Sequence, residues 1–321
     1  RRSAQPVGGP GLPPTGTRRM TDDEGTPDQP NPNGPDKRPD DLSADELAAA
    51  FHRRSDSGAA DWMRPREGRR ANATLLAHAD KQVPADPDGP LYGPLAQGLA
   101  LGALRALSTP DLWNTLSAIG SDGAARRGLL TAWGIENTDD WFTTMTSLIG
   151  LTEFIETESM LDARAVSIAR GGYSPSQFEE VWHDWLADHD YDDEAYEATQ
   201  DRLAAITAVD EILCDSGLLA PGGHVGSIGG YSLTWAVYLA RLGATAGYST
   251  EAQAAQMILS ARDRAAQIFA SWTEFAVSSV GGALLHEDIT GFVQLRRIAA
   301  TLLTVDHSPW RALPFPVGDI G

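Results

Sequence analysis

The stretch that decides the fold is VGSIGGYSLTWAVYLARL, residues 225–242. Its side chains are apolar on nearly every side, and a helix of that kind is buried in the core of a protein. The apolar run is also too short to span a bilayer, which takes about 20 consecutive apolar residues. This stretch therefore predicts the central helix of a globular domain.

Helical periodicity continues on both sides of the central stretch. Residues 91–107 form one apolar stripe, and Thr109-Pro110-Asp111 predicts a new helix that runs to Gly120, with proline at its first position. Ser249 and Thr250 cap a helix whose apolar face continues to Phe275. No stretch alternates with period two, so the fold class is all-α, a compact domain of about nine helices. The other predicted helices begin near 122, 138, 152, 174, 198 and 290.

The ends of the chain differ in composition. Residues 1–42 are rich in Pro, Gly, Asp and Asn and have almost no large apolar side chains, which predicts a disordered tail. Residues 43–90 contain a capping box at Ser43 and Glu46 and then a polar connector, so partial helical order is expected there. Residues 91–321 are predicted to form the helical domain.

The net charge of -19 is concentrated in that domain. Residues 91–321 hold 12 Arg and 29 acidic residues, a net charge of -17, and residues 179–215 hold thirteen acids against Arg202 alone. An acidic surface repels phosphate backbones, so nucleic acid is not an expected ligand, whereas a basic protein partner would be attracted. The alternative is that the charge serves solubility. The candidate interaction face is Asp188, Asp190, Asp192, Asp193 and Glu194.

Metal and cofactor motifs are incomplete. Glu180 and His183 have the spacing of a di-iron helix, but no second copy occurs. Residues 188–199 begin like a calcium loop and lack its glycine and its closing Glu, and His286 lacks the second His of a zinc helix. Cys214 is the only cysteine, and no lysine follows Lys81 that could form a Schiff base. We expect neither a metal nor a cofactor.

Three tryptophans and one arginine are the structural landmarks of the domain. Trp133, Trp272 and Trp310 carry large apolar surfaces and are expected to anchor packing junctions. Arg241 ends the most apolar helix, where a charge must find a partner or reach solvent. Glu274 and Asp210 are candidate partners for a buried polar core. The alternative is a cation that interacts with the C-terminus of its own helix.

These landmarks, in this order, resemble the bacterial family catalogued as domain of unknown function 1266, the YbeU/YbeR-like proteins. The matching stretches are Ala132–Ile135, Ala240–Gly243 running to Ser249, Ser271–Phe275, Gly281, and Pro309-Trp310 with Leu313-Pro314. The resemblance implies a mainly helical fold and no established activity. The chain departs from the family pattern at four polar positions, which are occupied by Tyr231, Ser232, Trp235 and Gly282.

Two functions fit these observations. The first is a non-enzymatic cytoplasmic interaction protein that presents its acidic face to a basic partner, for example in an immunity or antitoxin-like role. The cytoplasm is expected because Arg1-Arg2 is followed by Pro and Gly and not by the apolar run of a secretory signal, and no membrane association is expected. The alternative is an enzyme or a small-ligand-binding protein with a pocket between helices, in which acidic groups converge and their pKa values are perturbed.

Overall fold

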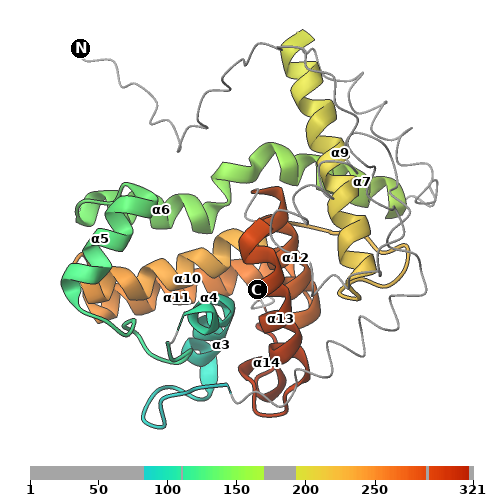
Figure 1. Ribbon diagram of the computed structural model, residues 1–321. Coiled ribbons are helices and arrows are strands. Elements are labelled where there is room, and N and C mark those ends of the chain that lie inside the picture. Colours follow the sequence, from blue (N-terminus) through green and yellow to red (C-terminus); the bar gives the residue numbers. More distant parts are fainter. Residues whose placement is uncertain (1–82, 110, 170–192, 287–288, 318–321) are drawn as a thin grey trace, which may run out of the picture. The chain divides into compact units, whose positions relative to one another are not determined.

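In the computed structural model, residues 83–109, 111–169, 193–286 and 289–317 are described, all within the unit Arg38–Gly321. These residues form helices joined by short loops and contain no strand, so the predicted all-α class is confirmed (Figure 1). The predicted tail 1–42, most of the extension 43–90 and the helix expected from Ser174 lie outside the described residues. The helices are α3 Gly93–Leu101, α4 Ala103–Ser108, α5 Asp122–Trp133, α6 Thr138–Gly150, η2 Thr152–Phe154, α7 Ile155–Ala169, α9 Asp193–Asp215, α10 Gly229–Ala246, α11 Glu251–Ile268, α12 Trp272–Leu285, α13 Ile289–Thr304 and α14 Pro309–Ala312.

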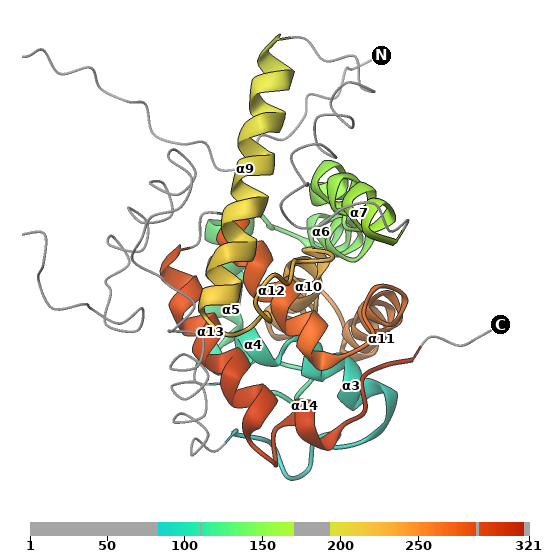
Figure 2. The ribbon, with the colours of Figure 1, turned by 90° about the vertical axis from the view of Figure 1, so that its right-hand side faces the viewer.

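Helix α10 is the centre of the domain, as its apolar sequence predicts. It packs against α11 and α12 and also against α5, α6 and α4, and the two ribbon views show these helices gathered around it (Figures 1 and 2). Two glycines permit close approaches between this helix and its neighbours. A Cβ at Gly243 would lie 2.1 Å from the indole nitrogen of Trp141, and a Cβ at Gly102 would lie 2.5 Å from Val237.

Most predicted helix boundaries are confirmed, and capping residues fix them. Ser121 caps the start of α5, and Gly134 ends it in the left-handed conformation with φ 66°. Thr250 and Gln253 form a complete capping box at the start of α11. Pro221-Gly222-Gly223 lies in a loop, residues 216–228, between α9 and α10.

The helix predicted from Thr109 to Gly120 is wrong. The described residues 111–120 form turns that fold around the side chain of Arg241. The Asp111 carboxylate accepts the backbone N–H groups of Leu112 and Ile119 and also binds the Arg241 guanidinium. The carbonyl oxygens of Leu112 and Thr115 accept bonds from the same guanidinium. Carbonyl oxygens that are directed at a side chain are not available for the backbone hydrogen bonds of an α-helix. These tertiary contacts therefore prevent the helix that Thr109-Pro110-Asp111 predicts.

The single helix predicted from Thr250 to Phe275 is also wrong, because two helices meet at a sharp corner. Helix α11 ends at Ile268, α12 begins at Trp272, and the chain bends by 103° between them. Ser271 causes the new start, since its hydroxyl accepts the N–H of Glu274 while the Glu274 carboxylate accepts the N–H of Ala270. The apolar period continues across the corner because Phe269 and Phe275 are both buried there.

Helix α9 begins at Asp193, earlier than the predicted start near residue 198. Acidic side chains in the first turn favour the positive end of a helix dipole, so an acidic run can start a helix as well as interrupt one. Residues 188–192 lie outside the described residues.

Two of the three tryptophan landmarks meet in the core. Trp272 and Trp310 are 6% and 4% exposed, and their rings stack with centroids 5.4 Å apart. Each indole N–H donates to a backbone carbonyl, at Leu313 and Ala100 respectively. Trp133 is half-buried and packs edge-on against Trp235 at 5.1 Å. The C-terminal SPWRALPF segment is thus part of the core and holds α3 and α12 together.

No single helix among the described residues has the length and apolar character that crossing a membrane would require. Helices α11 and α12 meet that test only as a pair, on either side of their 103° bend.

Candidate functional site

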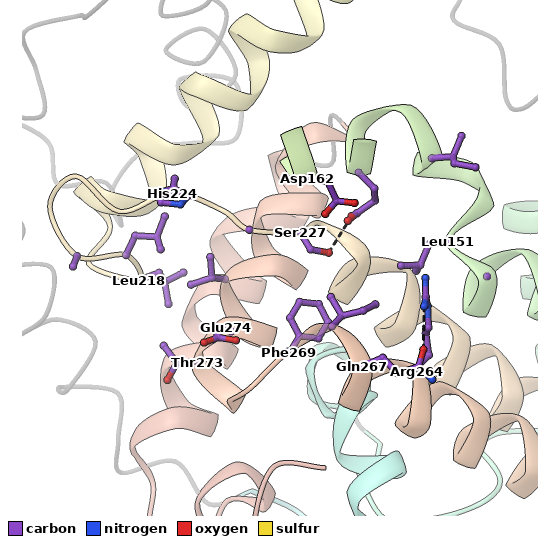
Figure 3. A pocket seen from close by; sticks show the side chains of 18 residues that line it. Leu151, Asp162, Leu218, His224, Ser227, Arg264, Gln267, Phe269, Thr273 and Glu274 are labelled. Carbon is purple, nitrogen blue, oxygen red and sulfur yellow. Dashed lines mark hydrogen bonds between the residues drawn. The ribbon is translucent and has the colours of Figure 1, made fainter. Parts of the chain in front are cut away.

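A pocket of about 740 Å³ opens where five parts of the fold converge. They are the end of α6, helix α7, the loop 216–228, the last turns of α11, and the first turns of α12 (Figure 3). We call it the interhelical pocket, and we call residues 216–228 the pocket loop. Its apolar lining includes Leu151, Ile155, Leu218, Leu219, Ile268, Phe269 and Val277, and its polar lining includes Glu158, Asp162, His224, Ser227, Arg264, Gln267, Thr273 and Glu274.

The pocket loop is held to α7 and α9 by side chains of those helices. Asp210 accepts the N–H of Val225 at 2.7 Å, and Arg164 donates to the carbonyl of Val225 and to Asp210. Arg164 is 1% exposed, so this ion pair is shielded from water and holds the loop firmly. The thiol of Cys214 donates to Ala220 at 3.2 Å. One wall of the pocket is therefore irregular backbone fixed by buried polar groups.

Glu158 joins the pocket loop to the start of the central helix. Its Oε1 accepts the hydroxyl of Ser227 at 3.0 Å and the N–H of Ile228 at 2.8 Å. Ile228 is the N-cap residue of α10, so the carboxylate caps that helix from α7. Burial raises the pKa of Glu158 and the neighbouring charge of Asp162 adds to this rise, while the two hydrogen bonds oppose it.

Leu151 marks backbone strain at the pocket wall. It is the one non-glycine residue of the described chain with positive φ, at 56°. A left-handed leucine costs on the order of 1–3 kcal/mol, and such strain persists only where the surroundings enforce it. Here the side chain is buried and lies against Gly229, where a Cβ would be 2.6 Å from Leu151 Cδ1. The strained turn places Leu151 between the pocket and the first residue of α10.

The other charged groups of the lining come from three elements. Glu274 and Thr273 are exposed at the start of α12, and Arg264 on α11 donates to the side chain of Gln267 at 3.1 Å. His224 lies in the pocket loop, and burial lowers its pKa, with the charge of Arg164 acting in the same direction. The imidazole therefore favours its neutral form.

The predicted polar core forms with a different partner. Arg241 is fully buried, and its ion pair is with Asp111 at 3.0 Å. Glu274 is exposed and caps its own helix, and Asp210 pairs with Arg164. Burial lowers the pKa of Arg241, while Asp111 opposes this effect. The expected pairing of Arg241 with Glu274 or Asp210 is wrong, because the turns of residues 111–120 bring Asp111 to the guanidinium.

The side chains of the predicted acidic face lie outside the described part of the structure. Asp188, Asp190 and Asp192 lie outside the described residues, and so do the side chains of Asp193 and Glu194, whose backbone opens α9. Glu180 and His183 are outside them as well. Among the described residues, no group of three or more His, Cys, Asp or Glu has the geometry of a metal site.

Sequence reasoning missed Glu158, Asp162, His224 and Ser227. Glu158 and Asp162 are four positions apart on α7 and so share one helix face, which is a readable signal. His224 and Ser227 directly precede the central helix, in a loop whose path the sequence does not specify. Their convergence depends on tertiary packing between segments about 70 residues apart.

Three of the four positions that depart from the family pattern lie at a separate aromatic cluster. Tyr231 stacks on His286 at 4.9 Å, and the guanidinium of Arg105 lies 4.0 Å from the centre of a Trp235 ring. A Cβ at Gly282 would lie 2.5 Å from the Cβ of Tyr231 and 3.0 Å from the carbonyl oxygen of Ile228. No side chain therefore fits at 282 unless the backbone of residues 228–231 shifts.

The fold and site define an all-helical protein with a pocket beside its central helix. Residues 128–315 match the family model described as "Protein of unknown function (DUF1266)", which covers more than half of the chain. The chain therefore belongs to the DUF1266 family. Comparisons with curated proteins and with solved structures find no match.

Proposed function

We propose that this protein binds a small organic molecule in the interhelical pocket. The observation that carries the proposal is the pocket itself, whose volume of about 740 Å³ lies within the range of roughly 300–1,000 Å³ typical of small-molecule sites. Its lining combines apolar side chains with a few convergent polar groups, as such sites do. Every lining residue also lies within the segment 128–315 that matches the family.

Strain and buried charge at the pocket wall support this proposal. The left-handed Leu151 and the raised pKa of Glu158 both lie at the junction of α7, the pocket loop and α10. Strained backbone and perturbed pKa values concentrate at functional sites, although ion-pair networks that serve structure also perturb pKa values. A ligand here would contact the fixed loop and the corner between α11 and α12 together.

Binding fits the geometry better than catalysis by Ser227. The Ser227 hydroxyl donates to Glu158 and accepts the N–H of Gly229 at 3.0 Å. Both interactions are those of a residue that caps the start of a helix. A serine nucleophile would instead direct its oxygen at a substrate and give its proton to a base that a third group orients.

A pocket-filling variant tests the proposal. Thr273 is exposed and lines the pocket, so Thr273→Trp should occupy the opening with little cost to folding. Gln256→Trp is the matched control, because Gln256 is exposed on α11 and does not line the pocket. A fragment library screened by saturation-transfer NMR should give binders that Thr273→Trp loses and Gln256→Trp keeps. The absence of binders, or binders that both variants keep, would refute the proposal.

The interaction hypothesis stays a prediction with its own test. If the acidic face binds a basic protein, changing Asp190, Asp192 and Asp193 to Lys should weaken capture of that partner from the native host and reduce the salt sensitivity of capture. Denaturant unfolding of the variant checks that it stays folded, since Asp193 begins α9. Unchanged capture would contradict this hypothesis.

A further inference from the structure

The charges around the interhelical pocket do not balance. Glu158, Asp162 and Glu274 contribute three carboxylates to the lining, whereas its basic side chains are Arg264 and His224. The lowered pKa of His224 favours its neutral form, whereas Arg264 keeps its charge while it donates to the neutral side chain of Gln267. Burial raises the pKa of Glu158, and a cation beside this carboxyl group would favour its charged form. The lining therefore has an excess of acidic over basic groups that a positively charged ligand would offset.

The excess is concentrated on one wall. Glu158 and Asp162 are one turn apart on α7, and Figure 3 shows the Asp162 carboxylate beside the hydrogen bond between Ser227 and Glu158. Like charges at this spacing repel each other. Within the part of the chain that the structure describes, neither carboxylate forms an ion pair. The hydrogen-bond partners of Glu158 are neutral groups, the Ser227 hydroxyl and the backbone N–H groups of Ile228 and Gly229.

The second oxygen of Glu158 takes no part in the bonds to Ser227 and Ile228. Glu158 is half-buried and lines the pocket, and both of those hydrogen bonds use Oε1 and leave Oε2 out. A donor placed between this oxygen and the Asp162 carboxylate would form charge-assisted hydrogen bonds and reduce the repulsion between the two groups.

Another part of the lining is apolar. Phe269 lies at the corner between α11 and α12, in the middle of the view in Figure 3, and the lining also includes Val277 on α12 and Leu218 and Leu219 in the pocket loop. These side chains suit an aliphatic or aromatic body.

We propose that the ligand is an amphipathic organic amine, with its ammonium group between Glu158 and Asp162 and its apolar body against Phe269, Val277 and Leu218. This inference rests on the proposed function, since it assigns a ligand class to the same pocket.

Three shape-matched probes test the ligand class by isothermal titration calorimetry with the full chain. They are 2-phenylethylamine, 2-phenylethanol and phenylacetate, which carry a positive, a neutral and a negative group on the same body. The amine should bind at least about tenfold more tightly than the other two, the effect of one charge-assisted hydrogen bond. Equal or tighter binding of the alcohol or the acid would overturn the inference. The absence of amine binding at a ligand concentration of about 10 mM, which sets the weakest dissociation constant that can be measured, would also overturn it.

Two conservative variants assign the contact. Asp162→Asn should weaken amine binding severalfold without harm to folding, because Asp162 is exposed and makes no hydrogen bond among the described residues. Glu158→Gln keeps an oxygen that can accept from Ser227 and Ile228 while it removes the charge, so it should act in the same way. Glu153→Gln is the control, since Glu153 lies outside the lining. Amine binding that survives both changes would overturn the placement.

The outcomes separate this inference from the proposed function. If phenylacetate or the alcohol binds and Thr273→Trp abolishes that binding, the pocket is a ligand site and the amine assignment is wrong. If the fragment screen yields no binder that Thr273→Trp displaces, the proposed function itself fails.

Discussion

The guanidinium of Arg241 lies 3.0 Å from the carboxylate of Asp111, across 130 positions of sequence. This buried pair joins the central helix to the turns of residues 111–120. The carbonyls of Leu112 and Thr115 also accept hydrogen bonds from the guanidinium, at 2.7 Å each. A methionine at 241 would leave the Asp111 charge buried without its cation.

Arg241→Met should therefore lower the free energy of unfolding by about 3–5 kcal/mol, the usual cost of removing one partner of a buried pair. Urea unfolding followed by circular dichroism measures this change. Arg311→Met is the control, because Arg311 forms an exposed pair with Asp306 at 3.7 Å that should contribute about 0–1 kcal/mol. A loss below about 1 kcal/mol for Arg241→Met would show that the pair is not a determinant of stability.

Removing the ring of Trp272 should open a cavity at the C-terminal junction. The ring stacks on Trp310, lies edge-on to Phe275 at 6.1 Å, and binds the carbonyl of Leu313. Trp272→Ala should cost about 3–5 kcal/mol, measured by denaturant unfolding. Tyr92→Ala should change little, since Tyr92 is 79% exposed. A Trp272→Ala protein of wild-type stability would mean that this junction contributes nothing to folding.

Two glycines in helices should respond to alanine in opposite directions. A Cβ at Gly243 would lie 2.1 Å from Trp141 Nε1, and that buried indole already donates to Leu239. Gly243→Ala should destabilise the protein by about 1–3 kcal/mol through overpacking. Gly128 has nothing within 4 Å of its Cβ position, so Gly128→Ala should stabilise α5 by about 0.5–1 kcal/mol. Thermal unfolding of both variants measures these changes, and a Gly243→Ala protein at least as stable as the wild type would contradict the close packing of α6 against α10.

Local sequence signals predicted the helices well and their tertiary links poorly. Ser121 with Gly134, and Thr250 with Gln253, act through neighbouring backbone, so their effects can be read directly from the chain. The turns of residues 111–120 depend on the side chain of Arg241, which α10 supplies. The corner at Ser271 has local caps, but the apolar period that continues across it hides the break. The resemblance to the family is confirmed by the family match over residues 128–315. It rests on packing residues, Trp272 and Trp310 among them, that are buried in the core.

The candidate site was less predictable for the same reason. Glu274 was singled out as a core residue and is instead an exposed group of the pocket lining. Glu158 meets Ser227 only after α7 packs beside the start of α10, and no local motif encodes that contact. Sequence alone offered a pocket between helices as an alternative without a location.

The titration of Glu158 gives a pH dependence of stability with a defined sign. Its pKa is raised above the ordinary value of 4.5, with burial as the largest cause. The folded protein therefore keeps this proton over a range of pH in which the unfolded chain has released it. The stabilisation that results is complete below the unfolded pKa and is lost as the pH rises through the folded pKa.

Glu158→Gln isolates this effect because glutamine does not titrate. The free energy of unfolding of the wild type minus that of the variant should decrease as the pH rises from about 4 towards neutrality and should then become constant. Urea unfolding at half-unit pH steps measures both proteins, and the other titrating groups largely cancel in the difference. A difference that increases with pH would mean that the hydrogen bonds from Ser227 and Ile228 outweigh burial, so that the carboxylate is most stable in its charged form.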